Sequence, residues 1–161
     1  MGLWRRIFAA LGVAAWLGGC DAGIEQLKPG VSTAREVRAV LGEPTYEWRE
    51  SDGATVWEFA GPRASYVTYM VTIGADGVMR TLHQVLADEY FARVRPGMDK
   101  AQIRRLIGRP IESMNFPGRG EEVWTWRHGA VMPEGIDEFH VHFDSDGKVV
   151  TTSRSKTAEP G

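Results

Sequence analysis

The stretch from Val94 to Pro110 reads Val-Arg-Pro-Gly-Met-Asp-Lys-Ala-Gln-Ile-Arg-Arg-Leu-Ile-Gly-Arg-Pro, and an earlier version of it runs from Leu27 to Pro44. In both versions a Pro-Gly turn leads into a capping residue, a short amphipathic run and a Gly-x-Pro sequence. Internal repetition of this kind indicates repeated structural units. We therefore expect two copies of one arrangement of helices and strands.

The first copy carries the signals of a short capped helix followed by strands. Thr33 and Glu36 have the spacing of a capping box, and Val37, Val40 and Leu41 then fall on one helical face. After this helix the hydrophobic period changes from about 3.6 to 2, which is typical of strands. The predicted strands span residues 46–49, 55–59, 66–73 and 78–84, with turns at Ser51-Asp52-Gly53 and Asp76-Gly77.

The second copy repeats this order of elements. A helix is expected over residues 87–94, where the first copy has only a turn at 24–27. Asp99 and Gln102 repeat the capping spacing, and Ile103, Leu106 and Ile107 repeat the apolar face. Further along, Val123-Trp124-Thr125-Trp126 matches Val56-Trp57-Glu58-Phe59. The alternating residues Phe139, Val141 and Phe143 match Tyr69, Val71 and Ile73, and the turn Asp146-Gly147 matches Asp76-Gly77. Length differences are expected only in loops, at 115–120 and 128–136.

These patterns predict an α+β fold made of two repeats. Each repeat has two short helices followed by an antiparallel β-meander, and the helices are expected to pack on one face of the sheet. The predicted organisation is a signal peptide at 1–19, a first repeat at 20–86, a second repeat at 87–153 and a disordered tail at 154–161.

The N-terminal segment has the features of an export signal. Arg5 and Arg6 precede an apolar stretch, and Leu17-Gly18-Gly19-Cys20 resembles the lipobox of bacterial lipoproteins. In such proteins the cysteine becomes the first residue of the mature chain and carries acyl chains, palmitate among them. Several chains on Cys20 would anchor the protein stably to a membrane. Asp21 resembles the signal that retains lipoproteins in the inner membrane of enteric bacteria.

Composition excludes several classes of function. The net charge of −2 provides no basic surface for nucleic acid. The single cysteine, Cys20, allows no intramolecular disulfide. No phosphate-binding loop or nucleophile motif is present, so neither an enzyme nor a bound cofactor is expected.

One group of side chains is a candidate set of metal ligands. His140, His142 and Asp144 alternate on a predicted strand, and residues at this spacing share one face of a sheet. Such a face could hold a divalent metal, and the histidines, with His128, could act as general bases. No further ligand motif supports either chemistry, so the favoured interpretation is a solvated or partner-facing surface without a metal.

The tryptophans divide into two groups. Trp57, Trp124 and Trp126 recur at matching positions, which favours core packing. Trp48 has Met114 at the matching position, so it is the better candidate for an exposed anchor. Met70 is the residue of the first copy that matches His140. The expected partner-binding residues are therefore Trp48, Met70, His140 and His142.

The second copy also resembles a known family. Pro-Gly-Met-Asp-Lys-Ala-Gln-Ile, Leu-Ile-Gly-Arg-Pro, the Trp-x-Trp strand and Val-His-Phe-Asp-Ser-Asp-Gly resemble the SmpA/OmlA domain of BamE lipoproteins. The resemblance implies a non-enzymatic accessory role in the complex that assembles β-barrels in the outer membrane. The presence of two copies of the domain in one chain is more similar to the two-repeat architecture of β-lactamase inhibitor proteins.

Two functional hypotheses follow from these patterns. The first is a lipid-anchored periplasmic protein that binds envelope proteins, such as the β-barrel assembly complex. The second is an inhibitor-like or scaffold lipoprotein with another periplasmic partner. The family favours the outer membrane, whereas Asp21 favours the inner membrane.

Overall fold

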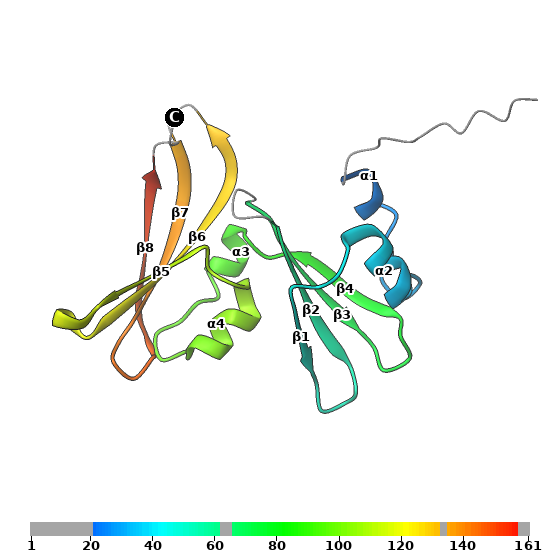
Figure 1. Cartoon of the computed structure of the whole chain (residues 1–161), viewed down its shortest axis with the longest axis horizontal. Helices are drawn as coiled ribbons and strands as arrows, with labels where there is room; N and C mark the ends of the chain where they lie inside the picture. Colours follow the sequence, from blue (N-terminus) through cyan, green and yellow to red (C-terminus); the bar gives the residue numbers. More distant parts are fainter. Residues whose placement is uncertain (1–20, 62–65, 133–134, 158–161) are drawn as a thin grey trace, which may run out of the picture.

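The computed structural model describes residues 21–61, 66–132 and 135–157 and has an α+β fold with two antiparallel sheets (Figure 1). The first sheet has the order β1-β2-β3-β4 and the second the order β5-β6-β7-β8. The helices are α1 (Asp21–Ile24), α2 (Ala34–Leu41), α3 (Asp88–Phe91) and α4 (Lys100–Ile107), with a 3₁₀ turn η1 (Pro117–Arg119). The strands are β1 (Tyr46–Arg49), β2 (Thr55–Ala60), β3 (Thr68–Ile73), β4 (Met79–Gln84), β5 (Glu112–Phe116), β6 (Glu121–Met132), β7 (Gly135–Phe143) and β8 (Val149–Thr157). The predicted fold class and antiparallel meanders are confirmed at this level.

The repeated motif ties each helix to the last strand of its own repeat. Both capping boxes form, with Thr33 and Glu36 at α2 and Asp99 and Gln102 at α4. The turn glycines also pair with strands. Gly30 donates to the Met79 carbonyl at 2.8 Å, and the Gly97 amide lies at the same distance from the Val149 carbonyl. The motif therefore fixes where the chain enters each helix.

Alternating side chains place one face of each sheet in a core. Val37 of α2 shares a buried cluster with Trp57, Phe59, Val71 and other residues of the first sheet. A larger cluster joins Ile103 and Ile107 of α4 to second-sheet residues, including Trp126, which is fully buried, Val141 and Phe143. The expected core packing of Trp57 and Trp126 is confirmed, and Trp124 packs against the larger cluster.

The larger cluster also crosses to the first repeat. Met70 of β3 belongs to it, and Trp48 and Val56 pack against it. In Figure 1, α3 and α4 lie between the two sheets. The second repeat's helices therefore contact the face of the first sheet that Val37 does not occupy, which we call the junction face.

Four predicted boundaries differ from the structure. The helix expected at 87–94 is confined to α3 because hydrogen-bonded turns replace its last residues. The loop expected at 128–136 is mostly the end of β6 and the start of β7, which pair as far as Met132 and Gly135. The loop expected at 115–120 begins inside β5, and β8 continues past 153 to Thr157 by pairing with Ile136.

The expected signal peptide and the lipidation site Cys20 lie outside the described residues. None of the helices in the described part of the chain is both long enough and apolar enough to span a lipid bilayer.

Candidate functional site

The candidate site is the side of the second sheet that points away from the core, which we call the outer face. Alternation along the strands decides which residues it presents, because Trp124, Trp126, Phe139 and Val141 point into the core cluster. The residues between them point outward. The outer face comprises Glu112, Met114 and Phe116 of β5, Glu121, Val123 and Thr125 of β6, Glu138, His140 and His142 of β7, and Ser153 and Ser155 of β8.

His142 joins three strands of this face. Its Nδ1 atom lies 2.6 Å from Glu121 Oε1, and its Nε2 atom lies 2.8 Å from Ser153 Oγ. Both ring nitrogens are thus engaged, which fixes the orientation of the ring.

His140 belongs to a second cross-strand network. Its ring nitrogens lie 2.9 Å from Thr125 Oγ1 and 2.8 Å from Ser155 Oγ. Burial lowers the pKa of His140, and the nearby Glu138 carboxylate opposes this only in part. This favours the neutral imidazole near neutral pH.

Glu138 completes the network beside His140. Burial alone would raise the pKa of its carboxyl, but hydrogen bonds from Thr157, Arg127 and Ser155 outweigh that effect and the pKa lies below its ordinary value. Arg127 Nε lies 3.0 Å from Glu138 Oε1. The carboxylate is therefore already neutralised by a cation of the same sheet.

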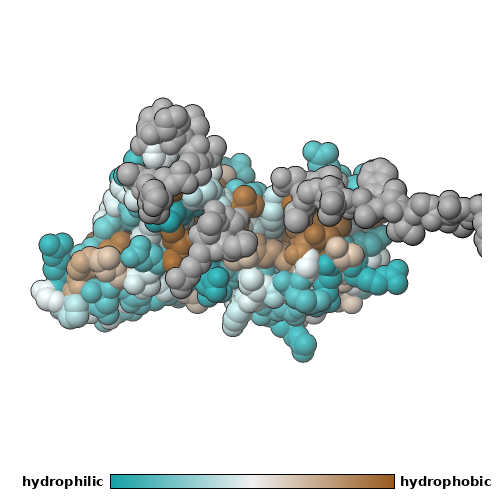
Figure 2. Space-filling model, turned by 45° about the horizontal axis from the view of Figure 1, so that its top comes forward, coloured by the Kyte–Doolittle hydropathy of each residue, from teal (hydrophilic) through white to brown (hydrophobic). Residues whose placement is uncertain are grey.

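A hollow of about 410 Å³ lies over the outer face. Its lining includes the apolar side chains of Met114, Phe116 and Val123 and the charged side chains of Glu112 and Arg119. Met114 is 47% exposed. In the view of Figure 2, hydrophobic residues reach the surface in both halves of the molecule, between hydrophilic ones. A hollow lined by both apolar and charged side chains suits a protein partner better than a small apolar ligand.

The histidines do not form a metal centre with Asp144. Asp144 lies beyond the end of β7, and its Oδ1 atom accepts hydrogen bonds from the Asp146 and Lys148 amides in the following turn. Among the described residues, no group of three or more His, Cys, Asp or Glu side chains is placed to bind a metal ion. The ring of His128 packs edge-on against the ring of Phe91, with 4.8 Å between the ring centres, and burial lowers the pKa of His128.

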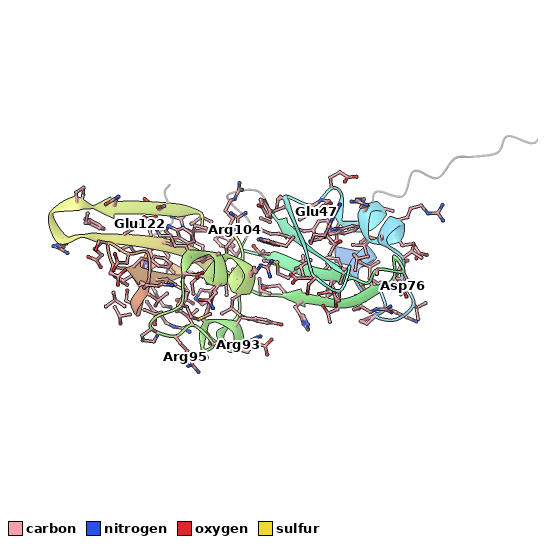
Figure 3. The ribbon with its side chains drawn as sticks, turned by 90° about the horizontal axis from the view of Figure 1, so that it is seen from below. Glu47, Asp76, Arg93, Arg95, Arg104 and Glu122 are labelled. Atoms are coloured by element: carbon pink, nitrogen blue, oxygen red, sulfur yellow. The ribbon has the colours of Figure 1, made fainter. Side chains whose placement is uncertain are left out.

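The equivalent side of the first sheet, the junction face, is occupied by α4. Glu58 of β2 is completely buried, and its Oε2 atom lies 2.9 Å from Arg104 Nη2 of α4. The Arg109 amide donates to Glu58 Oε1 at 2.8 Å. The Arg104 guanidinium also lies 5.3 Å from the centre of the Tyr46 ring. Figure 3 shows Arg104 at the junction of the two halves.

The structure separates the four predicted partner-binding residues into two pairs. His140 and His142 lie together on the outer face, as the strand alternation predicts. Met70 is only 6% exposed and sits in the cluster shared with the second repeat. Trp48 is half-buried against the same cluster. Both residues thus contact the second repeat, and their role in binding another protein stays a prediction.

Sequence reasoning missed Glu58 and Arg104 at the junction and Glu112 and Glu121 on the outer face. A signal existed for Glu58, because it is a carboxylate inside the apolar run Val56–Phe59. A buried charge needs a partner of opposite charge, so such a position predicts one. No comparable signal exists for the carboxylates of the outer face, since their position depends on the strand register.

Comparison with known proteins adds one specific match. Residues 84–153 match the model of the outer membrane protein assembly factor BamE domain, so the BamE resemblance is confirmed for the second repeat. No curated protein matches the chain in sequence.

Two similar solved structures have little sequence in common with the chain. One is a putative beta-lactamase inhibitor protein from Streptococcus mutans, 10% identical, with 84% of this chain and 94% of that chain covered and a TM-score of 0.34. The other is a DUF4309 family protein from Bacillus subtilis, 14% identical, with 81% and 82% covered and a TM-score of 0.31. TM-scores of this size carry no argument about fold or function.

Proposed function

We propose that this chain, whose residues 84–153 match the BamE domain, is a lipid-anchored protein-binding module of the cell envelope. It has no enzymatic activity and acts as an accessory factor in the assembly of outer-membrane β-barrel proteins. It is held to the membrane by acyl chains on Cys20 and faces the periplasm, in the outer membrane. The observation that carries the proposal is the BamE match over the repeat that contains the outer face.

The arrangement of the two repeats supports binding through the second one. We take the helices to cover one face of each sheet, which leaves the other face for a partner. In the first repeat that second face is the junction face, and it is already filled by α4. In the second repeat it carries the hollow with Met114 and Glu112. Partner binding is thus assigned to the outer face.

The polar networks of the outer face suit recognition better than catalysis. Each ring nitrogen of His140 and His142 already has a hydrogen-bond partner, so a proton-transfer role would first require these bonds to break. Networks of this kind hold side chains in fixed positions, which lowers the entropy cost of binding.

Affinity purification of the full-length protein from gently solubilised envelopes of its own host tests the proposal. We expect components of the β-barrel assembly machinery to be retained, and to be lost when Cys20→Ala removes the anchor. Retention of other periplasmic proteins without any assembly component would replace this function with the inhibitor-like or scaffold role. Density-gradient fractionation of the same membranes tests the outer-membrane location against the alternative suggested by Asp21.

A further inference from the structure

We propose that the outer face docks a helix of another protein that carries an arginine or lysine, seated as α4 is seated on the first sheet. The inference rests on the proposed protein-binding role and adds the kind of element that binds. Its basis is that the chain has two equivalent sheet faces, the junction face and the outer face, and that α4 covers the junction face.

The docking of α4 on the junction face shows what kind of element such a face binds. On the junction face, β1 and β2 pair so that Tyr46 lies opposite Glu58. Glu58 receives the Arg104 guanidinium from α4 and the Arg109 amide from the turn after it. Gly108 lies so close to this sheet that an added Cβ would be 2.8 Å from Thr68 Cγ2. The face thus accepts a helix C-terminus with a cationic side chain.

The outer face keeps a carboxylate at the same cross-strand pair. Here Glu112 of β5 lies opposite Thr125 of β6, in the register of Tyr46 and Glu58. The carboxylate has moved to the other strand of the pair, and it is exposed. Within the described part of the chain Glu112 makes no ion pair, whereas Glu121 and Glu138 have partners. Glu112 is therefore free to receive a cation.

Apolar contacts lie beside this carboxylate, as they do at the junction. Trp48 packs against the cluster that contains α4, and Met114 holds the equivalent position beside Glu112. Val56 and Val123 are a matched pair on the neighbouring strands. A helix that places one aliphatic side chain against Met114 and one cation at Glu112 would satisfy both features.

A second copy of this chain is a poorer occupant than a different protein. The element that would have to dock is α2, in which Arg38 stands where α4 has Arg104. Arg38 already pairs with Glu43 at 3.1 Å and Glu47 at 2.9 Å. Ala39 replaces Arg105, whose guanidinium lies 2.9 Å from Glu50 at the junction. The cations at the positions that dock on the first sheet are thus paired within the chain or missing from α2, so we assign the docking helix to another protein.

Site-specific photo-crosslinking in the native envelope tests this inference. A photoreactive phenylalanine analogue replaces Met114 in the full-length protein, and the same probe at Val31, exposed in the first repeat, serves as control. We expect crosslinks from position 114 to map to a helix of another protein, within about one turn of an arginine or lysine. Glu112→Gln should lower the crosslinking yield about tenfold, while Glu89→Gln, an exposed glutamate of α3, should leave it unchanged.

A charge exchange completes the test. Glu112→Lys should abolish the crosslink, and changing the partner's cation to glutamate should restore it. Crosslinks that reach only a second copy, an extended segment or no protein overturn the inference, as does a full yield from Glu112→Gln. If assembly components still copurify in that case, the proposed function stands without it. If they do not copurify and position 114 reaches no envelope protein, the proposed function fails as well.

Discussion

On the first sheet, Trp48, Glu58 and Met70 lie beneath the helices of the second repeat, whereas their counterparts Met114, Thr125 and His140 lie on the outer face of the second sheet. The two faces are built from the same arrangement of strands but differ in what covers them. The covered face is apolar around one fully buried, paired carboxylate. The uncovered face keeps apolar side chains such as Met114 on its first strands but has hydrogen-bonded polar side chains where Glu58 and Met70 stand on the covered face.

The difference shows that the neighbour, more than the strand pattern, sets the chemistry of each face. A methionine at position 70 is buried in the cluster that contains Ile103 and Ile107 of α4, while a histidine at position 140 forms hydrogen bonds with Thr125 and Ser155. Polar groups with satisfied hydrogen bonds keep an uncovered sheet face soluble. Substitutions of matched residues on the two faces test this difference.

The buried carboxylate should give the largest difference. Glu58→Ala leaves the Arg104 guanidinium without its counter-charge and should lower the free energy of unfolding by about 3 kcal/mol. Thr125→Ala, at the matching position, removes one hydrogen bond to His140 and should cost about 1 kcal/mol. Denaturant titration of both variants at one pH measures the two values. Equal losses would show that Glu58 does not hold the two repeats together.

The matched pair Trp48 and Met114 should give the next difference. Trp48→Ala removes a half-buried ring from the junction and should cost about 2 kcal/mol, less than a fully buried tryptophan. Met114→Ala changes an exposed side chain and should stay within about 0.5 kcal/mol. Thermal unfolding of the two variants distinguishes these outcomes. A similar cost at both positions would mean that the outer face is also covered in solution.

The two helix-terminal glycines should differ more modestly. Gly42 and Gly108 have positive φ angles of 81° and 77°, so alanine at either position is strained by roughly 1 kcal/mol. Only Gly108 also abuts the first sheet, where an added Cβ would clash with Thr68. Gly108→Ala should therefore cost about 1 kcal/mol more than Gly42→Ala. Equal unfolding free energies would argue that the junction is looser than the structure has it.

The sequence predicted local structure well because local structure depends on near neighbours. The capping pairs Thr33 with Glu36 and Asp99 with Gln102, and the Asp-Gly turns, specify helix starts and hairpins within a few residues of chain. The change of period from 3.6 to 2 then located the four strands of the first repeat, with errors at their ends, and internal repetition predicted the same order of elements in the second. The longest error was at residues 128–136, where residues 128–132 belong to β6 and residues 135–136 to β7.

The docking of one repeat on the other could not be predicted in the same way. It depends on Arg104, Gly108 and Glu58 meeting across a sequence separation that no periodicity reports. For that reason Trp48 and Met70 were expected on a binding surface and are found at the junction. His140 and His142 share a face as expected, because two-residue alternation alone decides that relation.

The smallest effect should be a pH dependence that belongs to the outer face. Burial lowers the pKa of His140 in the folded protein, so the unfolded chain binds a proton more readily below the ordinary histidine pKa of about 6.5. Stability should therefore fall as the pH drops through that value. His140→Gln should make the free energy of unfolding less dependent on pH between about 7 and 5.5.

Two features of the chain make this measurement interpretable. His128, whose pKa is also lowered by burial, should leave a residual slope in the His140→Gln variant, and Glu138 should contribute only at lower pH, where its depressed pKa lies. His83→Gln, at an exposed position of β4, is the control for replacing a histidine by glutamine. The first sheet has no counterpart to this effect, because Met70 stands where the second sheet has His140. An unchanged slope in His140→Gln would place the pH sensitivity elsewhere and remove this distinction between the two faces.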